Sequence, residues 1–409
     1  MMRWTFTLRN TKQREGHIEI MQKKDKRIAI LTSTRAHMFD LFQSLRDLGC
    51  DVKLLCGIPQ WKLDPDLKPG AMTRPWFVTM LAGFSRYRLK IPFRMKWEYL
   101  ARKDLSTWAA RHLSNTQILD ALAGWGLEAG QEIQRQGGIY VCNRGSSHIL
   151  FQKQILEEEH TKWGAPLSKG FPAWGVEREI AEYETANAVV VPSTFCKKTF
   201  IEYGVPEEKV FVCPYGVDLK LFHPVPKEDT RFRVIFVGSF SIRKGIGYLF
   251  EAMRPLVKKG LVDLWLVGGP SPEAKEILAQ NADIFINKGF HPRRELKWFY
   301  SQADVLVLPS VEEGLSLVQA QAMACGLPII ATENTGARDL FTDGVEGFIV
   351  PIRDPVAIKE KVEWMLNHPK ERKEMGRNAV QLVKGLHGWT DYAKKVLNMY
   401  SHLSSNGPA

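Results

Sequence analysis

The chain has 409 residues, of which 44% are hydrophobic and 25% are charged, and its formal net charge is +11. This length suits two domains better than one. No apolar stretch approaches the roughly 20 residues that a membrane-spanning helix needs, so no span is expected. The six cysteines form no C-x-x-C pair, which argues against a zinc site or disulfide framework and favours a reducing cytoplasm. The basic charge indicates attraction to anions, whether nucleic acid, phosphorylated ligands or acidic lipid headgroups.

The first half of the chain alternates between apolar strands and helical segments. Residues 1–25 are polar and basic and are predicted to form a flexible arm before the fold begins. The pattern after them predicts a helix at 37–48 and strands at 27–32, 51–56, 139–142, 188–191 and 209–213. Strand, helix and strand within about 30 residues is typical of a right-handed βαβ unit. Residues 26–218 are therefore expected to form one doubly wound α/β domain.

A second α/β series begins after residue 218. Strands are expected at 233–237, 262–267, 283–286, 304–308, 329–331 and 347–350, and helices at 245–258, 293–302, 317–325, 355–366, 369–385 and 391–402. Such alternation indicates a second Rossmann-like domain over 219–388, with a C-terminal helix at 389–409 that crosses back to the first domain. The two domains are expected to face each other across a cleft, with ligands beyond the carboxyl ends of the strands.

The most informative segment runs from Pro309 to Pro328 and joins an apolar strand to a helix of small residues. The first turn of a helix carries unpaired N–H groups and partial positive charge, so a phosphate group binds there at low cost. Glu313, just before that turn, is interpreted as a ligand for hydroxyl groups attached to the phosphate, as a sugar would present them. Its neighbour Glu312 is expected to point away. Ser316 and Gln319 have capping-box spacing, so Ser316 is also interpreted as a helix cap.

The loop after strand 233–237 combines glycines with two cations, Arg243 and Lys244. Glycines let the backbone approach a ligand, and the cations suit a diphosphate; the alternative is a solvated basic turn. The loop does not match G-x-x-x-x-G-K-[ST], and Gly245-Ile-Gly247 is only a fragment of G-x-G-x-x-G. Asp64-Pro65-Asp66 matches a D-x-D metal pattern but lies outside the series of strand-end loops, so no metal is proposed.

Polar residues also follow the strand at 139–142, where Asn143 to His148 are expected to line the cleft. His148 is a candidate catalytic residue that would bond a sugar hydroxyl or serve the acceptor, although a lone histidine more often serves structure. Between residues 86 and 103, seven Lys or Arg residues alternate with apolar ones. This pattern suits a contact with an anionic membrane surface, and equally a solvated helix packed on its domain. No RNA-binding motif accompanies it.

Several ordered motifs together resemble the retaining glycosyltransferases of family 4, which have the GT-B fold. Glu313-Gly-Leu-Ser-Leu-Val and Gln321-Ala-Met-Ala-Cys-Gly-Leu-Pro resemble the E-x7-E motif of that family, and 237–245 resembles its donor-phosphate loop. Segments 191–193, 212–218 and 336–347 resemble further family signatures in the same order. The resemblance implies two Rossmann-like domains, with the acceptor held by the N-terminal domain and a nucleotide-sugar by the C-terminal domain.

The resemblance also implies roles for individual residues. Glu313 would contact the donor sugar and Lys244 the diphosphate. Gln321 stands where the family usually has a second Glu that holds the ribose, and Ser239 stands where many members have a basic residue that Arg243 would replace. The full set of implied donor-binding residues is Gly238, Ser239, Arg243, Lys244, Phe290, His291, Gly314, Leu315, Ser316, Leu317, Val318 and Gln321. The first-strand loop lacks the double glycine of the family, and the candidates on the N-terminal side are Ser33, Arg35, Arg144 and Ser146.

The expected function is therefore transfer of a hexose-type sugar, with retention, from a UDP- or GDP-sugar to a hydroxyl of a glycan, lipid or cell-envelope precursor. No cofactor or metal is expected, and the expected location is cytoplasmic with a peripheral membrane contact through 86–103. Two alternatives stay open: a catalytically weak nucleotide-binding protein with the same fold, and a basic nucleic-acid-binding protein.

Overall fold

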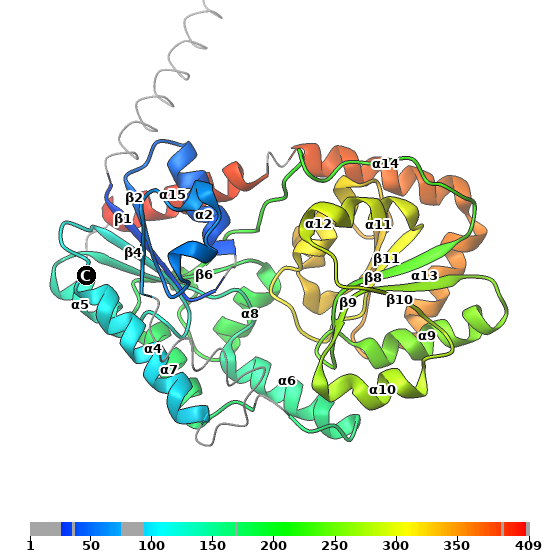
Figure 1. Cartoon of the computed structure of the whole chain (residues 1–409), viewed down its shortest axis with the longest axis horizontal. Coiled ribbons are helices and arrows are strands. Elements are labelled where there is room, and N and C mark those ends of the chain that lie inside the picture. Colours follow the sequence, from blue (N-terminus) through cyan, green and yellow to red (C-terminus); the bar gives the residue numbers. More distant parts are fainter. Residues whose placement is uncertain (1–25, 35–36, 75–93, 168–169, 386–387, 406–409) are drawn as a thin grey trace, which may run out of the picture. The chain divides into compact units, whose positions relative to one another are not determined.

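The computed structural model describes residues 26–34, 37–74, 94–167, 170–385 and 388–405. The expected arm at 1–25, Arg35, and residues 86–93 of the basic segment lie outside the described residues. Grouped by contacts, the chain forms two units (Figure 1). The first unit takes residues from 1–144, 172–190 and 392–409, and the second unit takes residues 145–171 and 191–391.

This division by contacts does not follow the boundary expected at residue 218. Residues 145–171 and 191–218 pack with the second unit, although β5 and β6, which flank the former, and β7, within the latter, belong to the first sheet. The C-terminal helix α15 (Trp389–Ser405) begins in the second unit, and its residues from Tyr392 onward pack with the first. The chain therefore passes between the units at four points rather than two.

The first sheet has the strand order β3-β2-β1-β4-β5-β6-β7, and the neighbours from β3 to β6 pair in parallel. Its strands are β1 (Ile28–Thr32), β2 (Val52–Cys56), β3 (Ala71–Thr73), β4 (Ile118–Leu122), β5 (Ile139–Asn143), β6 (Ala188–Val191) and β7 (Val210–Val212). The helices of this part of the chain are α2 (His37–Asp47), α4 (Arg94–Ala110), α5 (Leu127–Arg135), α6 (Ile149–Lys162), α7 (Ala173–Thr185) and α8 (Thr194–Glu202). The parallel order with crossover helices is that of a doubly wound domain.

The second sheet has the order β10-β9-β8-β11-β12-β13 and is parallel throughout. Its strands are β8 (Arg233–Phe240), β9 (Asp263–Pro270), β10 (Ile286–Gly289), β11 (Val305–Leu308), β12 (Ile329–Thr332) and β13 (Gly347–Val350). The helices are α9 (Ile246–Lys258), α10 (Lys275–Gln280), α11 (Leu296–Gln302), α12 (Leu317–Ala324), α13 (Pro355–Asn367) and α14 (Pro369–Gly385). The α/β class expected from the sequence is confirmed for both sheets.

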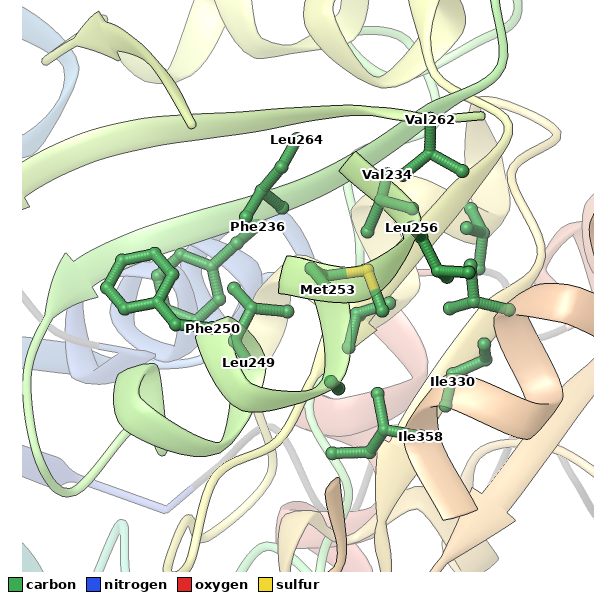
Figure 2. Packing of buried hydrophobic residues seen from close by; sticks show 14 of the residues in the cluster. Val234, Phe236, Leu249, Phe250, Met253, Leu256, Val262, Leu264, Ile330 and Ile358 are labelled. Carbon is green, nitrogen blue, oxygen red and sulfur yellow. The ribbon is translucent and has the colours of Figure 1, made fainter. Parts of the chain in front are cut away.

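Alternate residues of each central strand of the second sheet enter two different cores, as a strand buried on both faces requires. Val234 and Phe236 of β8 pack with α9 and α13, and Figure 2 shows this core, with Phe250, Met253 and Ile358 facing the sheet. On the other face, Ile235 and Val237 pack with residues of α11, α12 and α14. The near-continuous apolar runs in the sequence are therefore the signature of a sheet covered by helices on both sides.

Some strands differ from the sequence-based expectation, which includes neither β3 nor β4. The strand predicted at 283–286 begins instead at Ile286. The reason is that Ile284 packs into the hydrophobic core between the sheet and α9, and Phe285 stacks on Phe250 of α9 at 5.3 Å between ring centroids. Strand β4, at the centre of the first sheet, was not predicted, since Asp120 interrupts its apolar pattern. No helix in the described ranges is both long and apolar enough to cross a membrane.

Asp120 is a buried carboxyl group that connects β4 to the returning helix α15. Its Oδ2 accepts hydrogen bonds from the Tyr400 hydroxyl at 2.7 Å and from the Asn143 side-chain nitrogen at 3.5 Å, and Asn143 in turn bonds the ring of His37 at 2.7 Å. Burial raises the pKa of Asp120 from 3.8 to about 7, against the effect of these two hydrogen bonds. The folded protein therefore holds the proton on Asp120 more tightly than the unfolded chain does.

This pKa shift predicts a stability loss as pH rises. Below pH 3.8 the carboxyl is protonated in both states, and from there to about pH 7 the folded state binds more protons, so its stability falls. In the substitution Asp120→Asn the group is neutral at every pH, so raising the pH from 5 to 8 should lower the unfolding midpoint less than in the wild type. Scanning calorimetry at several pH values measures this. The exposed Asp283, whose pKa is lowered to about 2 by Lys258 and Arg254, is the control: Asp283→Asn should leave the slope unchanged, and parallel curves for Asp120→Asn and wild type would contradict the assignment.

Candidate active site

The loops that follow β8 and β11 meet at one edge of the second sheet, because these strands are parallel neighbours. The Val311 amide donates to the Arg243 carbonyl at 3.0 Å and joins the two loops through their backbones. Gly245, which precedes α9, has φ +70°, and a Cβ there would stand 2.0 Å from the Pro309 carbonyl oxygen. Glycine is therefore required at this position both by conformation and by space.

Four charged side chains gather where these loops meet. Lys244 Nζ lies 2.5 Å from Glu313 Oε1, and Arg243 Nη1 lies 2.9 Å from the same oxygen and 3.6 Å from Glu312 Oε2. Lys244, Glu312 and Glu313 are buried, whereas the Arg243 side chain is 34% exposed. The predicted cations and the predicted carboxylate thus come together on one edge of one sheet. Their roles in binding stay predictions.

The ammonium group of Lys244 is buried, so water solvates it poorly. Burial lowers its pKa, and the charge of Glu313 opposes that shift. A buried ammonium group needs a negative partner, and Glu313 is that partner in the structure. An anionic ligand brought to the same atoms would meet a cation that has already lost most of its water, which strengthens charge-assisted hydrogen bonds.

Helix α12 begins beside this cluster. Ser316 is its N-cap residue, but the Ser316 side chain makes no cap hydrogen bond to the first turn. Instead, the hydroxyl accepts from Lys244 Nζ at 3.5 Å, and Gln319 donates its side-chain amide to the Thr335 carbonyl at 2.9 Å. The expected capping box is therefore wrong, because both side chains have other partners. The partial positive charge of the helix start faces the same region as Lys244.

Glu312 also differs from expectation. It does not point away: its side chain is fully buried and accepts hydrogen bonds from Ser146, Ser147 and Gln152. Burial works against its ionisation, but Arg243 and these hydrogen bonds outweigh burial and lower its pKa. The sequence gives only a weak signal that Glu312 is a buried, hydrogen-bonded carboxylate, since two adjacent glutamates in a loop resemble any solvated turn.

The remaining residues predicted to bind the donor lie along the same sheet edge or on α12. Gln321 is buried, and its Oε1 accepts from the Tyr300 hydroxyl at 3.0 Å. Phe290 follows β10 and is 82% exposed, and His291 bonds both Glu295 and the Lys288 carbonyl. Gly238 and Ser239 form the end of β8, while Leu315, Leu317 and Val318 flank Ser316.

Gly314 is predicted as part of the phosphate loop, and the structure shows a packing reason for it. A Cβ at this position would stand 2.1 Å from the Gly145 carbonyl oxygen and 2.9 Å from the Pro192 ring. Gly247 is similar, since a Cβ there would be 2.3 Å from the Trp163 ring. The Gly245-Ile-Gly247 fragment is thus explained by close contacts with Pro309 and Trp163.

In the structure, the contacts of His148 are those of a residue that stabilises the fold. It is the N-cap residue of α6, where its Nδ1 accepts from the Leu150 amide at 3.3 Å. Its ring stacks on Tyr203 at 4.9 Å between centroids and meets Phe200 edge-on at 5.0 Å. These contacts account for a buried histidine at this position, and its catalytic role stays a prediction.

The structure describes three of the four residues predicted on the N-terminal side, and their roles stay predictions. Ser33 is buried at the end of β1, and Arg35 lies outside the described residues. Arg144 pairs with Glu179 at 3.0 Å within the first unit. Ser146 belongs to the second unit, where its hydroxyl donates to Glu312 at 2.6 Å.

The described part of the chain contains no group of three or more His, Cys, Asp or Glu side chains arranged to hold a metal ion. Asp64 precedes a short 3-10 turn, Pro65–Leu67, and Asp66 lies within it. Sequence reasoning included Ser147 in the polar segment 143–148 but missed Gln152, because nothing in the sequence links α6 to the loop after β11.

Comparison with known proteins relates this chain to glycosyltransferases. The family model described as Glycosyl transferases group 1 matches residues 219–382, and the model described as Glycosyltransferase Family 4 matches residues 146–221. The D-inositol 3-phosphate glycosyltransferase of Frankia alni is 31% identical over 90% of this chain and 94% of its own length. An uncharacterized glycosyltransferase of Methanocaldococcus jannaschii is 26% identical over 74% of this chain and 86% of its own.

Solved structures share the fold at lower identity. Sucrose-phosphate synthase from Thermosynechococcus elongatus has a TM-score of 0.71 and 21% identity, covering 93% of this chain and 100% of that one. Anabaena HepE in complex with UDP has a TM-score of 0.68 and 16% identity, covering 92% and 100%. These similarities confirm the GT-B fold expected from the sequence.

Loss of the buried cation should weaken anion binding. In Lys244→Met the side chain is one atom shorter and loses its charge, so affinity for inorganic pyrophosphate should fall about 10- to 100-fold, the range for one charge-assisted hydrogen bond. Isothermal titration calorimetry measures this. Lys258→Met is the matched control, because Lys258 lies on α9 with a 55% exposed side chain that pairs with Asp283. Equal affinity of Lys244→Met and wild type would show that Lys244 does not contact the anion.

Proposed function

The chain belongs to the family 4 glycosyltransferases, and we propose that it is a retaining enzyme that moves a hexose from a UDP- or GDP-sugar to an acceptor hydroxyl. The cluster of Lys244, Arg243 and Glu313 at the start of α12 carries this proposal. Two cations and a helix N-terminus suit a diphosphate, and a carboxylate beside them suits the hydroxyl groups of the attached sugar. The UDP complex of HepE supports UDP as the first nucleotide to test.

The reaction breaks the bond between the sugar carbon and the phosphate oxygen, and the diphosphate leaves with additional negative charge. Lys244, Arg243 and the first N–H groups of α12 stabilise that charge, which is the largest electrostatic demand of the step. Glu313 aligns the sugar through its hydroxyl groups. By the family resemblance, the acceptor attacks from the face of the leaving group, and a phosphate oxygen takes its proton. In this proposal the protein cations take the place of a metal ion.

Gln321 is the main departure from the family pattern, and we propose that it still binds the ribose. The Tyr300 hydroxyl holds the Gln321 oxygen at 3.0 Å, so the amide is oriented. An amide both donates hydrogen bonds to hydroxyl groups and accepts them, whereas a carboxylate only accepts them. Donor binding is therefore retained with a changed affinity or nucleotide preference.

A nucleotide screen followed by a transfer assay tests this proposal. One of UDP, GDP or ADP should raise the melting temperature, and the matching nucleotide-sugar should then be consumed in the presence of EDTA, slowly by hydrolysis or faster with an acceptor. The acceptor panel includes inositol phosphate, since one relative is named for it, as well as lipid-linked glycans. Glu313→Ala should lower turnover by about two to three orders of magnitude while the nucleoside diphosphate still binds.

Other outcomes point to the alternatives. Binding of a nucleoside diphosphate without turnover over the whole acceptor panel would favour a catalytically weak protein of the same fold. Salt-dependent RNA affinity that no nucleotide affects would favour the nucleic-acid-binding alternative. Near-normal turnover of Glu313→Ala would remove Glu313 from the proposed mechanism.

We also propose a cytoplasmic location with a peripheral contact between α4 and anionic membranes. Tyr99, Leu100 and Lys103 are exposed on α4 while Ala101 and Leu105 are buried, so apolar and basic side chains share the outer face of this helix. Such a face suits an anionic interface. Replacing Tyr99 and Leu100 by Ala should reduce co-sedimentation with phosphatidylglycerol vesicles, whereas Trp61→Ala, at a 67% exposed position on another segment, should not. Equal sedimentation with neutral and anionic vesicles would contradict the contact.

A further inference from the structure

Glu312 is a buried carboxylate that the protein holds in place through several hydrogen bonds. Its Oε1 accepts from the Ser146 hydroxyl at 2.6 Å, the Ser147 hydroxyl at 2.7 Å and the Ser147 amide at 3.1 Å. Its Oε2 accepts from the Gln152 amide nitrogen at 2.9 Å. A fully buried carboxylate with four such donors has little freedom to move. It therefore presents a stationary charge next to Glu313.

Arg243 contacts the backbone of Glu312 and the carboxylates of Glu312 and Glu313. A single guanidinium nitrogen, Nη1, donates to the Glu312 backbone carbonyl at 3.1 Å and lies 3.6 Å from Glu312 Oε2 and 2.9 Å from Glu313 Oε1. An arginine side chain loses rotamer entropy when it is ordered. Here the ordering is achieved by the protein itself, and about a third of the side chain remains exposed to a ligand.

We propose that Glu312 is a positioning residue that orients Arg243 beside Lys244 and so sets the affinity of the diphosphate site. This inference rests on the proposed function for the identity of the ligand. The physical reason is preorganisation: a guanidinium already held in place loses less freedom when the diphosphate binds. Glu312 itself touches neither the diphosphate nor the sugar in this arrangement.

Two simpler roles must be separated from positioning. Glu312 could act through its charge alone, in which case neutralising it would change anion affinity whether or not Arg243 is present. It could also act only as a structural tether between the loop after β11 and residues 146–152, in which case its loss would lower stability without a specific link to Arg243. A double-mutant cycle separates all three, because a direct charge effect appears equally in both backgrounds and cancels.

The experiment measures inorganic pyrophosphate affinity by calorimetry in wild type, Glu312→Gln, Arg243→Ala and the double variant. If Glu312 acts through Arg243, Glu312→Gln should cost about 5- to 30-fold more pyrophosphate affinity in the protein that retains Arg243 than in the Arg243→Ala variant. The paired substitution of Ser146 and Ser147 by Ala loosens Glu312 without altering any charge. It should weaken pyrophosphate binding in the protein that retains Arg243 and not in the Arg243→Ala variant. This pair of serine substitutions therefore tests the inference if Glu312→Gln does not fold.

Glu159→Gln is the matched control. Glu159 is a fully buried carboxylate of the same unit that accepts from the Tyr248 hydroxyl at 2.9 Å and from Arg353 at 2.5 Å. Its substitution should lower the melting temperature and leave pyrophosphate affinity within about twofold, since its partners lie outside the charged cluster.

The possible results separate this inference from the proposed function. Equal effects of Glu312→Gln in both backgrounds, with normal wild-type binding, would overturn the positioning role alone. Coupling between Glu312 and Arg243 without sugar transfer would support positioning and count against the proposed function. A wild-type protein that binds neither pyrophosphate nor a nucleoside diphosphate would overturn both.

Discussion

The candidate site depends on one constraint: two cations, of which Lys244 is buried and Arg243 is partly exposed, lie next to each other and must be neutralised. Lys244 and Arg243 are consecutive in the chain, and both approach Glu313 Oε1. Two like charges this close repel, and a buried ammonium group is poorly solvated. Glu313 and Glu312 balance them, so the four side chains are formally neutral as a group. The geometry of each loop follows from that requirement.

Close backbone approach makes the cluster possible. The loops after β8 and β11 come together because Gly245 leaves room for the Pro309 carbonyl, and the loop after β11 approaches the segment that carries Ser146 because Gly314 leaves room for the Gly145 carbonyl. A Cβ would stand 2.0 Å from a carbonyl oxygen at Gly245 and 2.1 Å from one at Gly314, so a side chain at either position would push the backbones apart. These glycines therefore act on the electrostatics of the site through packing, and need no direct contact with a ligand.

Helix α6 joins the second unit at both of its ends. Near its start, Gln152 and the preceding serines bind Glu312, and near its end, Glu159 and Trp163 pack against Tyr248 and Gly247 of α9. Although α6 follows a strand of the first sheet, its contacts belong with the loops that hold the charged cluster. The helix therefore supports the two loops of the candidate site from outside the second sheet.

The sequence by itself determined the α/β class, most of the strands of the second sheet and the presence of Lys244 and Glu313 in adjacent strand-end loops. Apolar runs, glycines and helix starts are local patterns, and local patterns survive without knowledge of distant contacts. Tertiary structure decided the burial of Glu312, the partner of Ser316 and the structural environment of His148. It also decided that β4 is a central strand despite Asp120, whose partner Tyr400 lies 280 positions away. Those outcomes depend on which groups meet from distant parts of the chain, and a polar side chain carries no local signal of whether it will meet water or a buried partner.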